Sequence, residues 1–293
     1  MNEYLVTNKV YIKSNNNSNL IINRYFYSLI FYIVLSIIIY LILKAPVLPL
    51  IKSISMSFII TSILGYIINL FYKDNKFINI YKQDNLHTIS LIIGIIGVNT
   101  NILILTIAIF LTVIINKLNK NISLSSSLYA IIIILIYKYI NNDLYILDMS
   151  NIELSKNLIN YVDSILSLII FTYLFYKKSI KYNIFIYYVI TIFLIMLGVG
   201  ILTGMHIILP FVVITSNNLI FLNVYTLTDY MNTPTINETG RVYGIILGII
   251  TSILSFIIYP LSVVIPLILG PYILTNYLDN NSYKFKYKIK SQK

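Results

Sequence analysis

The stretch Ser28–Leu43, which reads SLIFYIVLSIIIYLIL, contains no charged residue. Apart from two serines and two tyrosines it consists of isoleucine, leucine, valine and phenylalanine, so a helix formed by it is apolar on every side. Such a helix is found in a large protein core or in a membrane. Similar runs recur along the chain, and the sequence therefore predicts an all-α, polytopic membrane protein.

The composition of the 293 residues supports this fold class. Hydrophobic residues make up 58% of the chain and charged residues 11%, whereas a soluble domain carries about 25% charged residues. The absence of cysteine excludes disulfides and cysteine-held iron–sulfur clusters within this chain. The net charge of +11 does not indicate nucleic-acid binding, because the basic residues separate apolar segments instead of forming one face.

Ten apolar segments follow from these runs and their polar boundaries, and a membrane span needs about 20 residues. The third and fourth segments are short and are separated only by Asn99-Thr100-Asn101. They are either half-helices or one re-entrant pair, and any break between them must face protein or water. The ten segments are 25–43, 47–72, 86–98, 102–116, 123–140, 157–176, 182–202, 205–227, 242–259 and 261–279.

The basic residues predict the orientation of the segments. With the N-terminus in the cytoplasm, all but four of the 21 lysines and arginines fall on the inner side. This bias predicts ten crossings with both termini in the cytoplasm. Residues 1–24 are then a polar cytoplasmic N-terminus, 25–279 a single transmembrane domain, and 280–293 a basic cytoplasmic tail. The four exceptions are Lys44, Lys52, Lys138 and Lys156.

Ten crossings divide into two halves of five, and because five is odd, the halves would have opposite orientations, as in inverted-repeat transporters. A polar break, Asn99-Thr100-Asn101, follows His87 in the third segment, and another, Ser216-Asn217-Asn218, follows His206 in the eighth. Matching interruptions in two halves are typical of a site near the bilayer midplane. A chance match is the competing explanation in so asparagine-rich a chain.

A polar motif, residues 226–244, lies between the eighth and ninth segments and reads TLTDYMNTPTINETGRVYG. Thr233-Pro234-Thr235 predicts a turn, because proline fixes φ and lacks an N–H donor. The four-residue spacing of three glycines predicts a helix face that a second backbone can approach closely. For Asp229 two roles stay open: capping a helix, or shaping a cofactor or ion path. The three glycines are Gly240, Gly244 and Gly248.

This motif resembles the signature loop of the RnfD/NqrB family, the membrane components of the Rnf electron-transport complex and of the related sodium-pumping NADH:quinone reductase. The resemblance implies a ten-helix component of a complex that transfers electrons between ferredoxin and NAD⁺ and couples this to Na⁺ or H⁺ transport. It makes Thr228, Asp229, Thr233 and Thr235 candidates for cofactor binding. It also implies other membrane and peripheral subunits as partners, the bacterial cytoplasmic (inner) membrane as location, and no catalytic or metal-ligating residue in this chain.

Members of that family carry flavin mononucleotide, FMN, on a threonine of a Ser-Gly-Ala-Thr motif in the outer loop after the fifth helix. Here the corresponding loop 141–156 contains Asp148-Met-Ser150-Asn-Ile-Glu153. The Gly-Ala pair is missing, and Glu153, whose carboxylate cannot form the phosphoester, stands near the acceptor position. Ser150 is the remaining candidate acceptor, with neighbours unlike those of the family. We therefore expect no covalent flavin.

Two further acidic residues lie near the ends of predicted apolar segments. Asp84 precedes the third segment, and we expect it to cap that helix, with His87 nearby as a structural residue. Asp163 lies near the outer end of the sixth segment, where an acid invites an ion-path hypothesis. Its closeness to the interface instead predicts a solvated helix N-terminus.

The sequence leaves three functions open. The first is the membrane subunit of an Rnf-type complex, which would supply a helical scaffold and would not perform redox chemistry alone. The second is a degenerate relative that acts as a small-solute or ion permease, and the third is a scaffold without transport. The motif at 226–244 favours the first, and the missing flavin acceptor favours the second.

Overall fold

A computed structural model describes residues 4–71, 84–118, 125–141, 158–204, 208–229, 233–234, 237–257, 261–275 and 277–279. The described residues form helices and their connections, and no strand occurs among them. The all-α class predicted from the sequence is therefore confirmed for this part of the chain. The helices are α1 (Tyr4–Ile42), α2 (Leu48–Phe71), α4 (Asp84–Ile96), α5 (Ile102–Leu118), α6 (Ser125–Ile140), α7 (Leu158–Tyr176), α8 (Tyr182–Leu202), α9 (Leu209–Thr215), η2 (Ser216–Asn218), α10 (Leu219–Leu222), η3 (Asn223–Leu227), α11 (Asn237–Ile257), α12 (Leu261–Leu269) and η4 (Gly270–Leu274).

Within the described ranges, five helices are long and apolar enough to cross a membrane, and a bent pair raises this number to six. The five are α1, α2, α7, α8 and α11, and the bent pair consists of α9 with α10 and η3. α4, α5 and α6 are apolar but shorter. The membrane character of the chain thus stands, whereas ten crossings remain a prediction.

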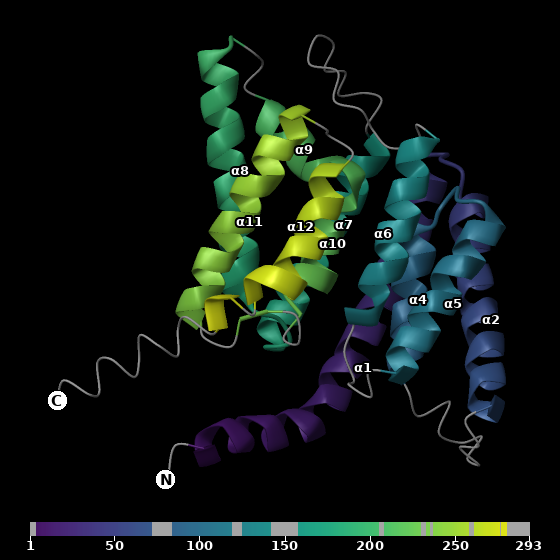
Figure 1. Ribbon diagram of the computed structural model, residues 1–293. Coiled ribbons are helices and arrows are strands. Elements are labelled where there is room, and N and C mark those ends of the chain that lie inside the picture. Colours follow the sequence, from purple (N-terminus) through teal and green to yellow (C-terminus); the bar gives the residue numbers. More distant parts are fainter. Residues whose placement is uncertain are drawn as a thin grey trace.

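Helix α1 is longer than the apolar segment predicted within it. Its apolar span, Ile21–Ile42, agrees with the predicted segment 25–43, and the helix itself begins at Tyr4 and continues through the polar N-terminal residues. Asparagine, serine and lysine have moderate rather than prohibitive helix propensities, so an apolar helix can extend through them when no proline or glycine intervenes. Figure 1 shows this polar part of α1 turning away from the other helices.

The helices form two groups that meet in the middle of the molecule (Figure 1). In the first group α2 packs against α4 and α5, and α5 packs against α6. In the second group α8 packs against α9 and α11, and α11 packs against α12. Where the groups meet, α1 lies against α7 and α6 lies against α12.

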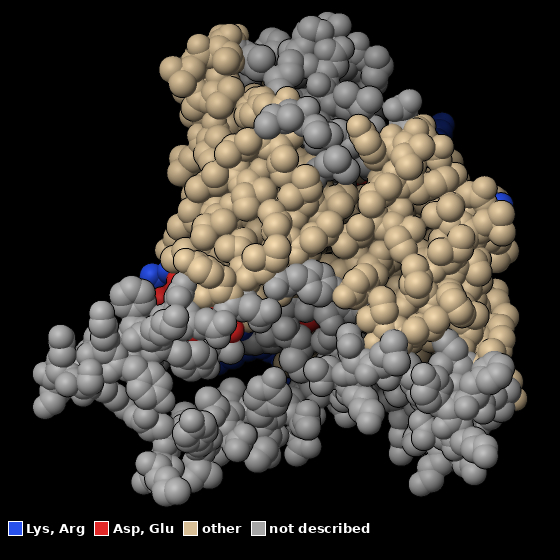
Figure 2. Space-filling view, in the orientation of Figure 1, with Lys and Arg blue, Asp and Glu red and all other residues tan. Residues whose placement is uncertain are grey.

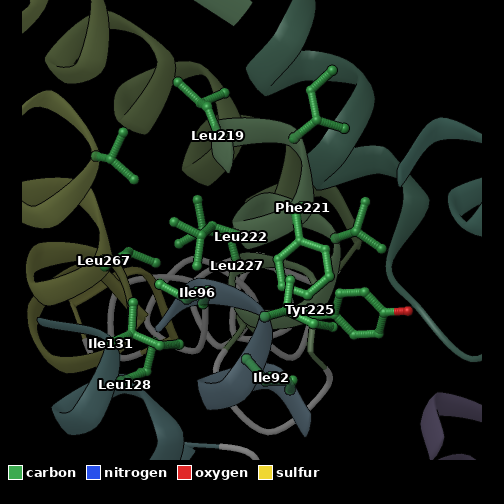
Figure 3. Packing of buried hydrophobic residues seen from close by; sticks show 14 of the residues in the cluster. Ile92, Ile96, Leu128, Ile131, Leu219, Phe221, Leu222, Tyr225, Leu227 and Leu267 are labelled. Atoms are coloured by element: carbon green, nitrogen blue, oxygen red, sulfur yellow. The ribbon is translucent and has the colours of Figure 1, made fainter. Parts of the chain in front are cut away.

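The interface between the groups is a tight apolar core (Figure 3). Ile92 and Ile96 of α4 face Leu222 and Leu227 of the bent segment, and all four side chains are buried. Dispersion contacts of this kind, together with close backbone approach, stabilise helix association in lipid, where no hydrophobic effect operates between helices. Leu128, Ile131, Leu219, Phe221, Tyr225 and Leu267 complete the labelled part of the cluster.

The outer surface of the bundle is also apolar. Phe31, Leu103, Leu194 and Ile253 are each more than half exposed, and many other large apolar side chains share this exposure. Figure 2 shows that the described surface on this side consists almost entirely of uncharged residues. Exposed apolar surface on this scale is untenable in water and is normal for helices that face lipid acyl chains.

Two asparagines mark breaks in the helices. Asn99, between α4 and α5, has φ of 66°, and Asn218, between α9 and α10, has φ of 56°. Asparagine adopts this left-handed backbone more readily than most residues because its short amide can bond locally. α9 and α10–η3 meet at an angle of 57°. Both polar breaks noted in the sequence therefore contain a left-handed asparagine.

Candidate functional site

The motif that follows η3 begins inside the bundle. Thr226 and Thr228 have no exposed surface, and the Asp229 side chain is also buried. The Thr228 hydroxyl donates a hydrogen bond to the Val224 carbonyl over 2.6 Å, and the Thr226 hydroxyl donates to the Leu222 carbonyl. Both threonines thus satisfy their hydroxyls on the helix that precedes them, as serine and threonine commonly do in apolar surroundings.

Lys181, in the connection between α7 and α8, holds the rest of this loop. Its backbone N–H donates to the Thr228 carbonyl over 3.3 Å. Its ammonium group donates to the Thr233 carbonyl over 3.5 Å and to the Pro234 carbonyl. Burial lowers the pKa of Lys181 to about 8, against the opposing charges of Asp279 and Asp229. The two described residues of the predicted turn, Thr233 and Pro234, are therefore both bound by one partly buried lysine.

α1 reaches the same connection from the other side. The Arg24 guanidinium donates to the Lys177 carbonyl and, over 3.3 Å, to the Ser179 hydroxyl. The Tyr25 hydroxyl donates to the Ser179 carbonyl over 3.1 Å. The connection 177–181 thus lies between α1 and the loop after η3, and it links the first span to the motif.

Three of the five predicted cofactor-binding residues lie in the described part of the structure. Thr228, Asp229 and Thr233 lie together and are buried, whereas Thr235 and Ser150 lie outside the described residues. Glu153, the residue near the expected acceptor position, also lies outside them. The described groups do not fit a flavin phosphate, since the Thr228 hydroxyl already donates to the backbone and the Asp229 carboxylate would repel the phosphate. In this structure they hold the loop in place.

The glycine face of α11 lies against α8. A β-carbon placed at Gly244 would come within 2.7 Å of the Ile184 carbonyl oxygen, and one placed at Gly248 within 2.8 Å of the Thr191 β-carbon. At Gly240 the nearest atom, on Ile184, would lie 3.4 Å away. The two helices can approach this closely only because the side chains are missing, and the approach is tightest at Gly244 and Gly248.

Asp84 and His87 serve the start of α4. The helix begins at Asp84, where the sequence predicted it to begin. The His87 ring stacks on Phe58 of α2 with ring centroids 4.8 Å apart, and Thr88 beside it is fully buried. These contacts fix α4 to α2, which agrees with the structural role expected for His87.

Asp163 occupies a different environment from the one predicted. Instead of a fully solvated helix start, its carboxylate accepts hydrogen bonds from the Tyr40 hydroxyl of α1, at 2.9 Å to each oxygen. The buried Tyr32 of α1 lies on the same side of the helix and close enough to the carboxylate to interact with it. The adjacent Ser164 donates to the Thr215 carbonyl, where α9 ends, over 3.0 Å. Asp163 therefore joins α7 to α1, and Ser164 joins α7 to the broken span, while part of the Asp163 surface is still exposed.

The sequence reasoning missed Tyr32, Ser36 and Tyr40 because each lies inside a run that reads as uniformly apolar. The signal that would have found them is their spacing of four residues, which places them on one face of α1. No group of three or more histidine or acidic side chains gathers anywhere in the described ranges. No family model matches the chain, and no curated protein is found as a relative.

Proposed function

We propose that the chain is a membrane subunit of an Rnf-type ion-translocating electron-transport complex in the bacterial cytoplasmic membrane. The observation that carries the proposal is the loop from Thr228 to Pro234, whose sequence resembles the family's signature. Lys181 binds this loop to the connection between α7 and α8, so the motif is built into the bundle. In this role the chain supplies a helical scaffold, and redox groups on other subunits carry the electrons.

We further propose ten crossings with both termini in the cytoplasm, arranged as two inverted halves. The ten apolar segments of the sequence each contain a helix in the described ranges. The helix contacts support the division: α2 packs on α5 as α8 packs on α11, and α5 packs on α6 as α11 packs on α12. α1 meets its counterpart α7, and α6 meets its counterpart α12, as a two-fold relation between the halves requires.

A permease is the second candidate function, and two observations favour it. The helix break at residues 216–218 packs against α7, where Ser164, the neighbour of Asp163 in the chain, donates to the Thr215 carbonyl. Discontinuous helices with an acidic side chain nearby are typical of transporter sites. A permease also needs no flavin acceptor, in agreement with the altered loop at 141–156.

Purification from native membranes separates the two candidates. A tagged chain solubilised in mild detergent should co-elute with iron–sulfur and NAD-binding proteins, identified by mass spectrometry. A monodisperse chain that elutes without any redox protein would contradict the Rnf-type assignment and favour the permease.

The same experiment tests the loop. Lys181→Met should reduce the co-eluting proteins, because it releases the turn at Pro234, while Lys177→Met removes the same charge nearby without breaking that contact. Equal losses in both variants would assign the effect to net charge and not to the loop.

A further inference from the structure

One face of α1 carries a row of hydroxyl groups through the apolar bundle. All five residues are buried, and none is more than 8% exposed. From first to last the row covers fifteen residue steps, which is about 22 Å along a helix and most of the roughly 30 Å hydrocarbon layer. The opposite face bears large apolar side chains that are about half exposed or more, such as Phe31 and Val34. The row consists of Tyr25, Ser28, Tyr32, Ser36 and Tyr40.

The ends of the row reach polar groups on other elements. At one end the Tyr25 hydroxyl meets the connection at Ser179, and one turn further the Ser28 hydroxyl lies 2.9 Å from the Tyr225 hydroxyl of η3. At the other end Tyr40 binds the Asp163 carboxylate, and Tyr32 lies near that carboxylate. The aromatic ring of Phe221 fills the space between Tyr225 and Tyr32, with centroids 4.8 Å and 5.2 Å away. In Figure 3 the Tyr225 hydroxyl points away from the labelled apolar side chains.

A purely structural role of the row does not account for Ser36. Its side-chain oxygen is buried and has no hydrogen-bond partner among the described residues. Burial of an unsatisfied hydroxyl costs about 1–3 kcal/mol, and alanine would fill the same place without this cost. Ser36 lies between Tyr32 and Tyr40, one helical turn from each, on the face of α1 that reaches Asp163 through Tyr40.

We propose that this hydroxyl row and Asp163 form a proton path along the contact between α1 and α7. A hydroxyl both donates and accepts, so it can take up one proton while it releases another. Each step breaks one O–H bond and forms one O–H bond, so no charge accumulates on the row and no oxidant or reductant is needed. Asp163, which is partly exposed, exchanges protons with water at its end of the path.

The ligand set favours a proton over a metal cation. The Tyr40 hydroxyl shares its single proton between the two carboxylate oxygens, so this proton already occupies the position that a cation bound by both oxygens would need. A hard cation requires about six oxygen ligands, and the described residues bring no cluster of three acidic or histidine side chains together. The titratable groups that face the path are Tyr32 and Tyr40 from α1 and Tyr225 from η3, while the end of α9 contributes the Thr215 carbonyl.

The path uses residues of this chain only, so it goes beyond the Rnf-type assignment and can be tested apart from it. The full chain is reconstituted into vesicles that contain a pH-sensitive dye, and a potassium diffusion potential drives proton uptake. The wild-type protein should acidify the vesicles faster than protein-free vesicles do. Asp163→Asn should abolish the difference, and Tyr32→Phe should reduce it severalfold.

Tyr188→Phe is the matched control, because Tyr188 is an equally buried tyrosine whose hydroxyl bonds to Thr251, away from α1. It should leave the uptake rate unchanged. Ser36→Ala separates conduction from stability: it removes an unpartnered group, so the melting temperature should hold or rise while the uptake rate falls.

Three results would overturn the path. The first is no uptake by monodisperse wild-type protein, and the second is uptake that survives Asp163→Asn. The third is uptake that requires Na⁺ and is insensitive to pH, which would assign a cation site in place of a proton path.

Discussion

The Lys181 ammonium group donates a hydrogen bond to the Pro234 carbonyl, across 53 positions of the chain. This contact joins the start of α8 to a turn that precedes α11, and it does so with a charged group that is largely buried. Because Asp229 and Asp279 lie close to the ammonium, the lysine keeps two acidic partners at the end of the bundle where the C-terminal helix finishes.

The burial of Lys181 predicts a pH dependence of stability. Its pKa is lowered from 10.5 to about 8, so between these values the unfolded chain binds more protons than the folded chain. Stability from this group therefore increases as the pH rises through about 8. The melting temperature of the wild-type protein in detergent should rise relative to that of Lys181→Met between about pH 7 and about pH 9. A parallel pH response in both proteins would contradict the burial of the ammonium group.

The glycine face of α11 predicts a position-specific loss of stability. In Gly244→Leu the new side chain would meet the α8 backbone at Ile184, so the two helices must separate. Gly198→Leu is the control, because a β-carbon there has no atom within 4 Å. The first variant should lower the melting temperature in detergent and the second should not. If both variants melt with the wild type, α11 does not pack against α8 through this face.

The sequence allowed the fold class and most helix positions to be predicted, because runs such as Ser28–Leu43 are stable only where they are shielded from water, and so many of them in one chain favour a membrane. The glycine spacing at Gly240, Gly244 and Gly248 also predicted a close helix approach, although the partner could not be named. Which helix lies opposite a small-residue face depends on tertiary packing, and spacing along one helix contains no information about it.

The environment of Asp163 could not be predicted for a similar reason. Asp163 lies near the N-terminal end of α7, and this position in the sequence predicted a solvated side chain. Its partners Tyr32 and Tyr40 are more than 120 residues away in sequence, since the Tyr40 contact spans 123 positions. The polar residues before residue 25 end the apolar span but not the helix, which begins at Tyr4, because polarity alone does not end a helix.

The contact between Ser28 and Tyr225 predicts a measurable contribution to stability. Ser28→Ala leaves a fully buried tyrosine hydroxyl without this partner, and such interhelical bonds in membranes are worth about 0.6 kcal/mol on average and up to about 1.7 kcal/mol. Ser55→Ala removes an exposed hydroxyl that bonds within α2 only. Thermal melting in detergent should show a loss for the first variant alone.

The charge distribution predicts the sidedness of the loops. Reporter fusions after Lys120 and after Lys181 should behave as cytoplasmic, and a fusion near Ser150 should behave as external. A fusion at the C-terminus should be cytoplasmic, in keeping with the basic residues 284–293. An external signal at that end would exclude an even number of crossings with both termini inside.

The outer loop predicts the absence of covalent flavin. The chain co-expressed with a flavin transferase should show no flavin fluorescence on a denaturing gel, because Glu153 offers no ester-forming hydroxyl and Ser150 lacks the Gly-Ala neighbours. Restoring Ser-Gly-Ala-Thr across 150–153 should restore labelling. Fluorescence of the unmodified chain that disappears in Ser150→Ala would instead identify Ser150 as a shifted acceptor.

The 57° bend between α9 and α10 has a consequence for biogenesis. A segment interrupted by Ser216-Asn217-Asn218 leaves backbone groups without helical partners, and each such group costs several kcal/mol in hydrocarbon. The Ser164 hydroxyl of α7 already pairs with the Thr215 carbonyl at the break. The bent segment therefore depends on α7, which is synthesised earlier, and we expect it to enter the membrane docked on α7 and not as an independent helix. We expect the order of the spans along the chain to be an order of assembly.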